Sequence, residues 1–201
     1  MKRLENKTAI VTGGNSGIGK ATAILFAKEG ADLVLCARRK EALDKVAEEC
    51  RGYGVQVVTV KADVSSHEDC SAVVKAAVDT FGKVDILVNN AGIVDKHRPI
   101  TECTDEWWDE IIAIDQSSRF YMMKDTIPHM MAAGKGSIIN VSSIGGVFGN
   151  GGISYSAAKS AALAMTKNVA IQLAPNGIRC NAVCPGPTPT PLNTPEKVAE
   201  F

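Results

Sequence analysis

A tyrosine and a lysine lie four residues apart in the stretch YSAAK, at Tyr155 and Lys159. In a helix this spacing places both side chains on one face, one turn apart. An ammonium group beside a phenol favours the phenolate, so the phenol can exchange a proton closer to neutral pH. A pair of this kind is suited to acid–base chemistry at an oxygen atom of a substrate. The alternative for an isolated pair is a packed tyrosine beside an exposed lysine.

The stretch TGGNSGIG, residues 12–19, places Gly13, Gly17 and Gly19 between an apolar run and a helix-like pattern. Unpaired N–H groups and the helix dipole make the N-terminus of such a helix a binding site for anions. A loop of this kind can hold the pyrophosphate of a dinucleotide. The alternative is a tight turn that needs glycine at positive φ and holds no ligand.

Two serines, Ser142 and Ser143, end the strand-like run SIINVSS. The carboxyl ends of parallel strands are where such sheets bind ligands. A hydroxyl group there can stabilise charge that develops on a substrate oxygen. From the residues alone, either serine can fill this role.

Short apolar runs alternate with helical patterns along the chain and predict a single α/β domain, residues 1–201, with a doubly wound parallel sheet. The expected strands are residues 8–12, 32–37, 55–62, 84–89, 137–142 and 178–184. The expected helices cover about residues 18–26, 43–50, 70–81, 105–131 (interrupted or bent near Pro128) and 154–174. Residues 185–201 contain the proline-rich run PGPTPTPLNTP, which we expect to be a substrate-loop segment. Because a domain seldom ends on such a run, we expect the natural chain to continue beyond Phe201.

Composition excludes several classes of function. Lysine plus arginine and aspartate plus glutamate both number 22, so the net charge is zero and indicates neither a nucleic-acid nor a membrane partner. The polar N-terminus is not a signal peptide, and no apolar run is long enough to span a membrane. The six cysteines form no CxxC pair and the three histidines show no ligand spacing. We therefore expect a cytoplasmic protein with reduced thiols and no metal site.

Four motifs occur in a fixed order: TGxxxGxG from Thr12, NNAG from Asn89, YxxxK from Tyr155 and NxxxPG from Asn181. In this order the motifs resemble those of the short-chain dehydrogenase/reductase family. The resemblance implies a Rossmann-fold oxidoreductase that uses a nicotinamide cofactor and forms a homodimer or homotetramer. It also implies a longer chain than this one, with a further strand and helices at the C-terminus.

The resemblance extends to the residues expected around the cofactor. They are Gly13, Asn15, Ser16, Gly17, Ile18, Gly19, Arg38, Arg39, Asp63, Val64, Asn89, Ala91, Gly92, Tyr155, Lys159, Pro185, Gly186, Thr188 and Thr190. Cofactor choice follows from the residues themselves. An acid after the second strand would bind a ribose 2′-hydroxyl group, whereas an arginine accommodates a 2′-phosphate. Arg38 and Arg39 stand there, so we expect NADP(H), with NAD(H) as the alternative.

The resemblance also implies catalytic roles: Tyr155 as the acid and base, Lys159 as its partner that holds the nicotinamide ribose, and Ser143 at the substrate oxygen, with Ser142 as a substitute. Relatives usually carry an asparagine in the central helix, where this chain has Asp115. A carboxylate there would pair with Lys159 and raise its pKa, or act as a different proton relay.

The expected activity is hydride transfer between NADP(H) and a ketone or secondary alcohol. A 3-oxoacyl thioester, a hydroxysteroid or bile acid, a sugar and a small ketone are all candidate substrates. Because Asp115 departs from the family pattern, a non-catalytic NADP(H)-binding sensor or scaffold is the alternative.

Overall fold

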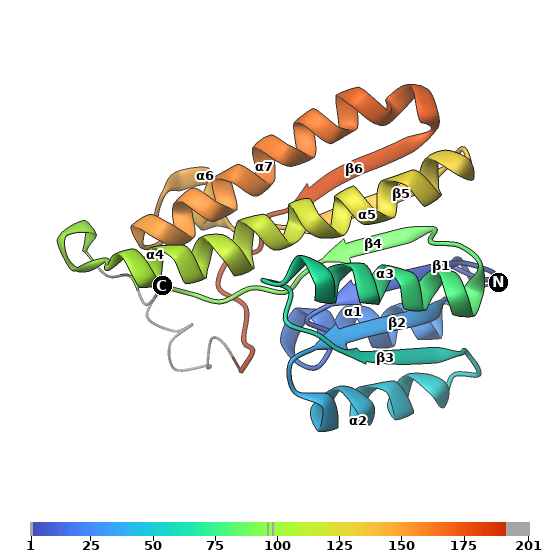
Figure 1. Cartoon of the computed structure of the whole chain (residues 1–201). Helices are drawn as coiled ribbons and strands as arrows, with labels where there is room; N and C mark the ends of the chain where they lie inside the picture. The colour runs from blue at the N-terminus through green and yellow to red at the C-terminus, as the bar shows by residue number, and fades with distance from the viewer. Residues whose placement is uncertain (1, 96, 98, 192–201) are drawn as a thin grey trace.

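The computed structural model describes residues 2–95, 97 and 99–191, and these build one sheet of six parallel strands in the order β3-β2-β1-β4-β5-β6 (Figure 1). The predicted doubly wound α/β fold is therefore confirmed. The strands are β1 (Thr8–Thr12), β2 (Asp32–Ala37), β3 (Val57–Lys61), β4 (Ile86–Asn89), β5 (Gly136–Val141) and β6 (Ile178–Val183). All residues of β1 and β4 are buried, as expected for central parallel strands covered on both faces.

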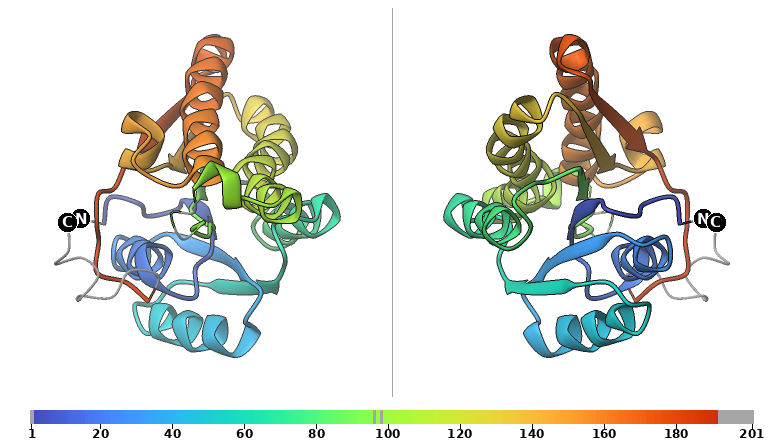
Figure 2. Two further views of the ribbon diagram at one scale, coloured as in Figure 1. Left: turned by 90° about the vertical axis from the view of Figure 1, so that its left-hand side faces the viewer. Right: turned by 90° about the vertical axis from the view of Figure 1, so that its right-hand side faces the viewer.

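Helices cover both faces of the sheet, as the end-on views of Figure 2 show. They are α1 (Gly17–Lys28), α2 (Lys40–Arg51), α3 (His67–Phe81), α4 (Asp105–Ile112), α5 (Ser118–Ala132), α6 (Ile144–Phe148) and α7 (Ile153–Leu173). One hydrophobic core lies between the sheet and α1 with α2, and the other lies between the sheet and α3, α5 and α7. Both cores consist mainly of the aliphatic side chains that the sequence pattern predicts.

The long central helix differs from its prediction. A π-helical turn, η2 (Ala113–Ser117), separates α4 from α5, and α5 continues through Pro128 to Ala132. Of the two outcomes predicted near Pro128, an interruption or a bend, the interruption is wrong, because the helix continues through this residue. The change of hydrogen-bond pattern lies instead at Asp115, inside the π-helical turn. Such turns are frequent at functional sites.

The strand order reverses beside β1, since β1 leads to β2 on one side and pairs with β4 on the other. At such a reversal the connections after neighbouring strands diverge and leave a crevice at the carboxyl ends. The residues after β1, β2, β4 and β5 therefore meet at one edge of the sheet.

The short helix α6 has no counterpart in the sequence prediction, and β3 and β4 each begin two residues later than predicted. The predicted helix boundaries otherwise agree with the structure within a few residues, as the termini of α3 illustrate. Ser66 caps α3 by accepting a hydrogen bond from the Asp69 N–H group at 3.2 Å, and Gly82 ends the helix at φ 72°. Among the described residues, no helix is long and apolar enough to cross a membrane.

Candidate active site

A cavity of about 990 Å³ opens at the carboxyl edge of the sheet. Most residues predicted to bind cofactor or substrate line it: Gly13, Asn15, Ser16, Gly17, Ile18, Arg38, Arg39, Asp63, Val64, Ala91, Gly92, Ser143, Tyr155, Lys159, Pro185, Gly186, Thr188 and Thr190. Gly19, Asn89 and Asp115 do not line it. Residues 192–201, the last part of the predicted substrate-loop segment, lie outside the described residues.

The glycine loop brings the N-terminus of α1 to the cavity. Ser16 is the N-cap residue, and its side chain makes no capping hydrogen bond. The first N–H groups of α1 are therefore available to an anion at the cavity wall. A side chain at Gly13 would lie 2.9 Å from the Asn90 amide nitrogen, and one at Gly19 would collide with the carbonyl oxygen of Gly13. These contacts explain why the loop needs glycine at both positions.

The NNAG motif is held to the end of β1. The hydroxyl oxygen of Thr12 accepts hydrogen bonds from the N–H groups of Asn90 at 2.9 Å and Ala91 at 3.0 Å. Asn89 does not reach the cavity, because its side chain is buried and donates to the Asn140 side chain at 2.9 Å. Asn90 lines the cavity instead.

The two arginines after β2 have different surroundings. With the Asn15 amide in the orientation that satisfies both groups, its oxygen accepts from Arg39 Nη2 at 2.9 Å and from Nε at 3.2 Å. Arg38 and Asp63 both line the cavity, and the charge of Arg38 acts on the Asp63 carboxylate. Burial acts to raise the pKa of Asp63, but hydrogen bonds from Ser65 and the charge of Arg38 outweigh burial and lower it.

Tyr155 lies in the first turn of α7 and faces Ser143 at the start of α6. Burial raises the pKa of Tyr155, while the Ser143 hydroxyl acts in the opposite direction. Ser143 also accepts a hydrogen bond from the Gly145 N–H group at 3.0 Å. The buried Ser142 hydroxyl instead donates to the carbonyl oxygen of Lys159 at 2.7 Å. Of the two serines, Ser143 is thus the one beside the tyrosine.

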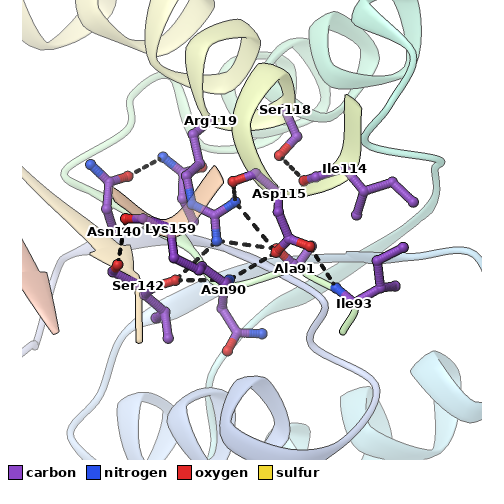
Figure 3. Close-up of polar contacts among 12 residues, drawn as sticks. Asn90, Ala91, Ile93, Ile114, Asp115, Ser118, Arg119, Asn140, Ser142 and Lys159 are labelled. Atoms are coloured by element: carbon purple, nitrogen blue, oxygen red, sulfur yellow. Dashed lines mark hydrogen bonds and ion pairs between the residues drawn. The ribbon is translucent and has the colours of Figure 1, made fainter. Parts of the chain in front are cut away.

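Lys159 is buried behind the Tyr155 ring, with its Nζ atom 5.3 Å from the ring centroid. Its ammonium group forms an ion pair with Asp115 Oδ1 at 2.8 Å and lies 3.5 Å from the carbonyl oxygen of Val141 (Figure 3). The other carboxylate oxygen of Asp115 accepts from the Ile93 N–H group at 3.0 Å. The structure therefore brings Asp115 to Lys159, as the first of its two predicted roles requires.

Asp115 acts on Lys159 in the predicted direction, but the net shift of the lysine pKa is downward. Burial and the charge of Arg119 lower its pKa, Asp115 raises it, and the outcome is a pKa of about 8. The prediction considered Asp115 without Arg119, which lies one helical turn further along and is 1% exposed. At Tyr155, burial of the phenol outweighs the Ser143 hydroxyl and the charge of Arg119 and raises the pKa, and a lowering by Lys159 together with a bound nicotinamide stays a prediction.

Asp95 is a site residue that sequence reasoning missed. Its buried carboxylate accepts from the N–H groups of Gly152 at 3.2 Å and Tyr155 at 2.9 Å, and from the Ser154 hydroxyl at 3.1 Å. It thus caps α7 from the segment after β4 and fixes the turn that carries Tyr155. A single acid in an irregular segment gives no sequence signal for this role.

Within the described part of the chain, no group of three or more His, Cys, Asp or Glu side chains could hold a metal ion. The cavity can perform proton transfer and charge stabilisation through Tyr155, Ser143 and Lys159. The glycine loop and Arg38 can hold phosphate groups at its other end. The arrangement therefore suits a dinucleotide cofactor with its reactive ring beside the tyrosine.

Comparisons with known proteins agree with this geometry. A family model described as short chain dehydrogenase matches residues 7–200. The 3beta-hydroxysteroid dehydrogenase 2 of Eggerthella lenta is 42% identical over 189 residues, which are 93% of this chain and 73% of that protein. The 3-oxoacyl-(acyl-carrier-protein) reductase of Thermotoga maritima is 39% identical over 201 residues, covering 98% of this chain and 81% of the relative.

A solved structure extends the comparison to three dimensions. The 3-ketoacyl-(acyl-carrier-protein) reductase from Brucella melitensis, complexed with NADH, superimposes with a TM-score of 0.91 and 36% identity. The match covers 98% of this chain and 83% of that one. The region matched by the family model includes every residue that lines the cavity.

Proposed function

Because the chain belongs to the short-chain dehydrogenase family, we propose that it transfers a hydride between NADP(H) and a ketone or secondary alcohol in the cavity beside Tyr155. The chain is an NAD(P)-dependent oxidoreductase of alcohol and ketone groups. The proposal concerns the residues that act, the preferred cofactor and the substrate class. The observation that carries it is the grouping of Tyr155, Ser143 and Lys159 at a cavity that also contains the glycine loop.

In ketone reduction, Tyr155 gives its phenolic proton to the oxygen that becomes the alcohol. A raised pKa keeps this phenol protonated before the reaction. The Ser143 hydroxyl donates a hydrogen bond to the same substrate oxygen and stabilises its developing charge. Lys159, in the next turn of α7, supplies a positive charge that favours the tyrosine anion left behind. The bound nicotinamide supplies the hydride, and in alcohol oxidation it accepts one.

Preference for NADP(H) is supported by the arginines after β2. Arg39 already shares its guanidinium with Asn15, so Arg38 is the better partner for a 2′-phosphate group. We expect NADPH to bind about tenfold or more tightly than NADH, about 1.4 kcal/mol in binding free energy. Fluorescence titration with both cofactors tests this. Arg38→Asp should reverse the preference and Arg179→Asp, on the exposed part of β6, should leave it unchanged. Equal affinities in the parent protein would contradict the assignment.

The substrate is proposed to be a 3-oxoacyl thioester, a hydroxysteroid or bile acid, or a similar alicyclic ketone. This range is supported by relatives named for steroid and 3-oxoacyl substrates. Absorbance at 340 nm with a panel of such ketones and alcohols tests it. Turnover of none of them with either cofactor would contradict the proposal and favour the sensor alternative.

A cytoplasmic location and a homodimer or homotetramer are also proposed. The location is supported by the free cysteines among the described residues, four of which are buried. Assembly is supported by large apolar side chains exposed on helices: Phe120 and Met131 of α5, and Ile153 and Ile171 of α7. Light scattering during size exclusion measures the oligomeric state, and a monomer at micromolar concentration would contradict this part.

A further inference from the structure

Three ionisable side chains, Asp115, Arg119 and Lys159, are buried together behind Tyr155. Their exposures are 0%, 1% and 4%. Burying charges is costly unless they are paired and hydrogen-bonded. When all three are ionised, two cations face one carboxylate and the cluster holds one excess positive charge. Such a cluster, placed directly against a reacting phenol, has to be built by specific contacts.

Arg119 makes these contacts through backbone oxygens of three segments (Figure 3). Its guanidinium donates to the carbonyl of Asp115 in the π-helical turn, to that of Val141 at the end of β5 at 2.9 Å, and to that of Ala91 after β4 at 3.5 Å. Lys159 approaches the same Val141 oxygen at 3.5 Å. Arginine and lysine therefore share one backbone acceptor as well as one carboxylate.

The carboxylate of Asp115 lies between the two cations. Its Oδ1 atom is 2.8 Å from Lys159 Nζ and 3.9 Å from Arg119 Nη1. The ion pair of Asp115 and Lys159 alone would be neutral and would direct no net charge at Tyr155. The arginine restores the positive charge that the acid removes, because a guanidinium stays protonated and matches several acceptors at once.

We propose that Arg119 is a positioning residue matched to Asp115: it is fixed to the turn that carries this acid and offsets the aspartate charge, so that the buried cluster keeps one net positive charge beside Tyr155. This inference rests on the proposed function for what Lys159 does in turnover. The pairing itself rests only on the buried contacts. Arg119 touches neither the cavity nor the substrate, since it is absent from the cavity wall.

The charged groups around Lys159 define what each substitution does. Asp115 faces it from the π-helical turn, Arg119 from α5 and Tyr155 from its own helix, while Asp95 acts on Tyr155 from the segment after β4. Without Asp115, two buried cations face each other with no acid, so the lysine loses its proton more easily. Without Arg119, a neutral aspartate–lysine pair remains. Without both, the lysine alone carries one positive charge, which equals the net charge of the parent cluster.

The experiment compares four proteins: the parent, Asp115→Asn, Arg119→Met and the double variant. Asp79→Asn and Arg179→Met, at exposed positions of α3 and β6, are matched controls. For each protein we would measure the pH profile of kcat by absorbance at 340 nm, the NADPH affinity by fluorescence, and the midpoint of unfolding in urea. NADPH binding checks that each variant is folded.

We expect Asp115→Asn to lower kcat at about pH 7 by about tenfold or more, because the lysine loses its proton more easily once the acid that raises its pKa is removed. The double variant should recover to within about threefold of the parent, with the alkaline limb of its pH profile restored. The urea midpoint should follow the same order, with Asp115→Asn less stable than the double variant. Both controls should match the parent.

Two results would overturn the pairing. One is an Asp115→Asn protein with the pH profile and stability of the parent. The other is a double variant no better than the worse single variant in both kcat and urea midpoint. An inactive parent would count against the proposed function instead, and the order of the urea midpoints would then still decide whether Arg119 and Asp115 are matched.

Discussion

Replacing Lys159 by arginine removes a titration from the site while keeping a cation in it. Burial and the charge of Arg119 lower the Lys159 pKa to about 8, against the opposing effect of Asp115. Such a group is about nine-tenths charged near pH 7 and about one-tenth charged near pH 9. We therefore expect kcat for ketone reduction by the parent to fall about tenfold between these pH values. Tyr155 does not cause this fall, because its raised pKa keeps it protonated.

The arginine variant should be less active than the parent but should lose the alkaline limb, because a guanidinium stays charged throughout this range. The assay follows NADPH oxidation at 340 nm with saturating ketone from about pH 6 to about pH 10, with NADPH affinity measured in parallel. Lys124→Arg, at an exposed position of α5, serves as the matched control and should retain the parent profile. An unchanged limb near pH 8 in Lys159→Arg would refute the assignment of the titration to this lysine.

Three other outcomes follow from the site. Gly19→Ala places a Cβ atom against a carbonyl oxygen of its own loop, so we expect the NADPH affinity to fall and the free energy of unfolding to drop by about 2 kcal/mol. Fluorescence titration and urea unfolding measure both effects, and the control Gly52→Ala, at φ −57°, should change little in either. Asp95→Ala removes the cap of α7, so the free energy of unfolding in urea should fall by about 2 kcal/mol, and kcat should fall because the capped turn carries Tyr155. An unchanged kcat would contradict the capping role. For Lys159, the folded pKa of about 8 lies below the ordinary 10.5, so between these pH values the folded state binds fewer protons than the unfolded state. The free energy of unfolding of the parent, relative to Lys159→Met, should therefore rise by about 3 kcal/mol as the pH increases from about 8 to about 10.5. A difference that does not change with pH would count against the lowered pKa.

The sheet was predictable because its signal is local. The run Thr8–Thr12 has an apolar centre between two threonines and is buried throughout, which is typical of a central parallel strand. The π-helical turn at Ala113–Ser117 was not predictable, because a shift in backbone hydrogen bonding leaves the apolar pattern almost unchanged. Helix α6 has only five residues, two of them glycine, and gives no periodic signal.

The site was predictable where a motif carries it. The pair Tyr155 and Lys159 lies together as the four-residue spacing requires. Arg119 was missed because a charge in a helix is ordinarily exposed, and only its position four residues after Asp115 could have indicated a pair. The pKa of Lys159 could not be predicted, since it depends on burial and on which charge lies nearer. Asn89 and Asn90 differ in the direction of their side chains, which alternates along a strand and beyond its end.

The measurement that tests the central claim most directly compares the parent with Tyr155→Phe in NADPH oxidation at 340 nm, using 3-oxoacyl thioester, steroid and alicyclic ketone substrates. The phenylalanine keeps the ring over Lys159 but has no proton to give. We predict that the parent oxidises NADPH only in the presence of a ketone, and that Tyr155→Phe binds NADPH with nearly the same affinity while kcat falls by about 10²-fold or more. A variant that retained most of the parent turnover would contradict the account of this site.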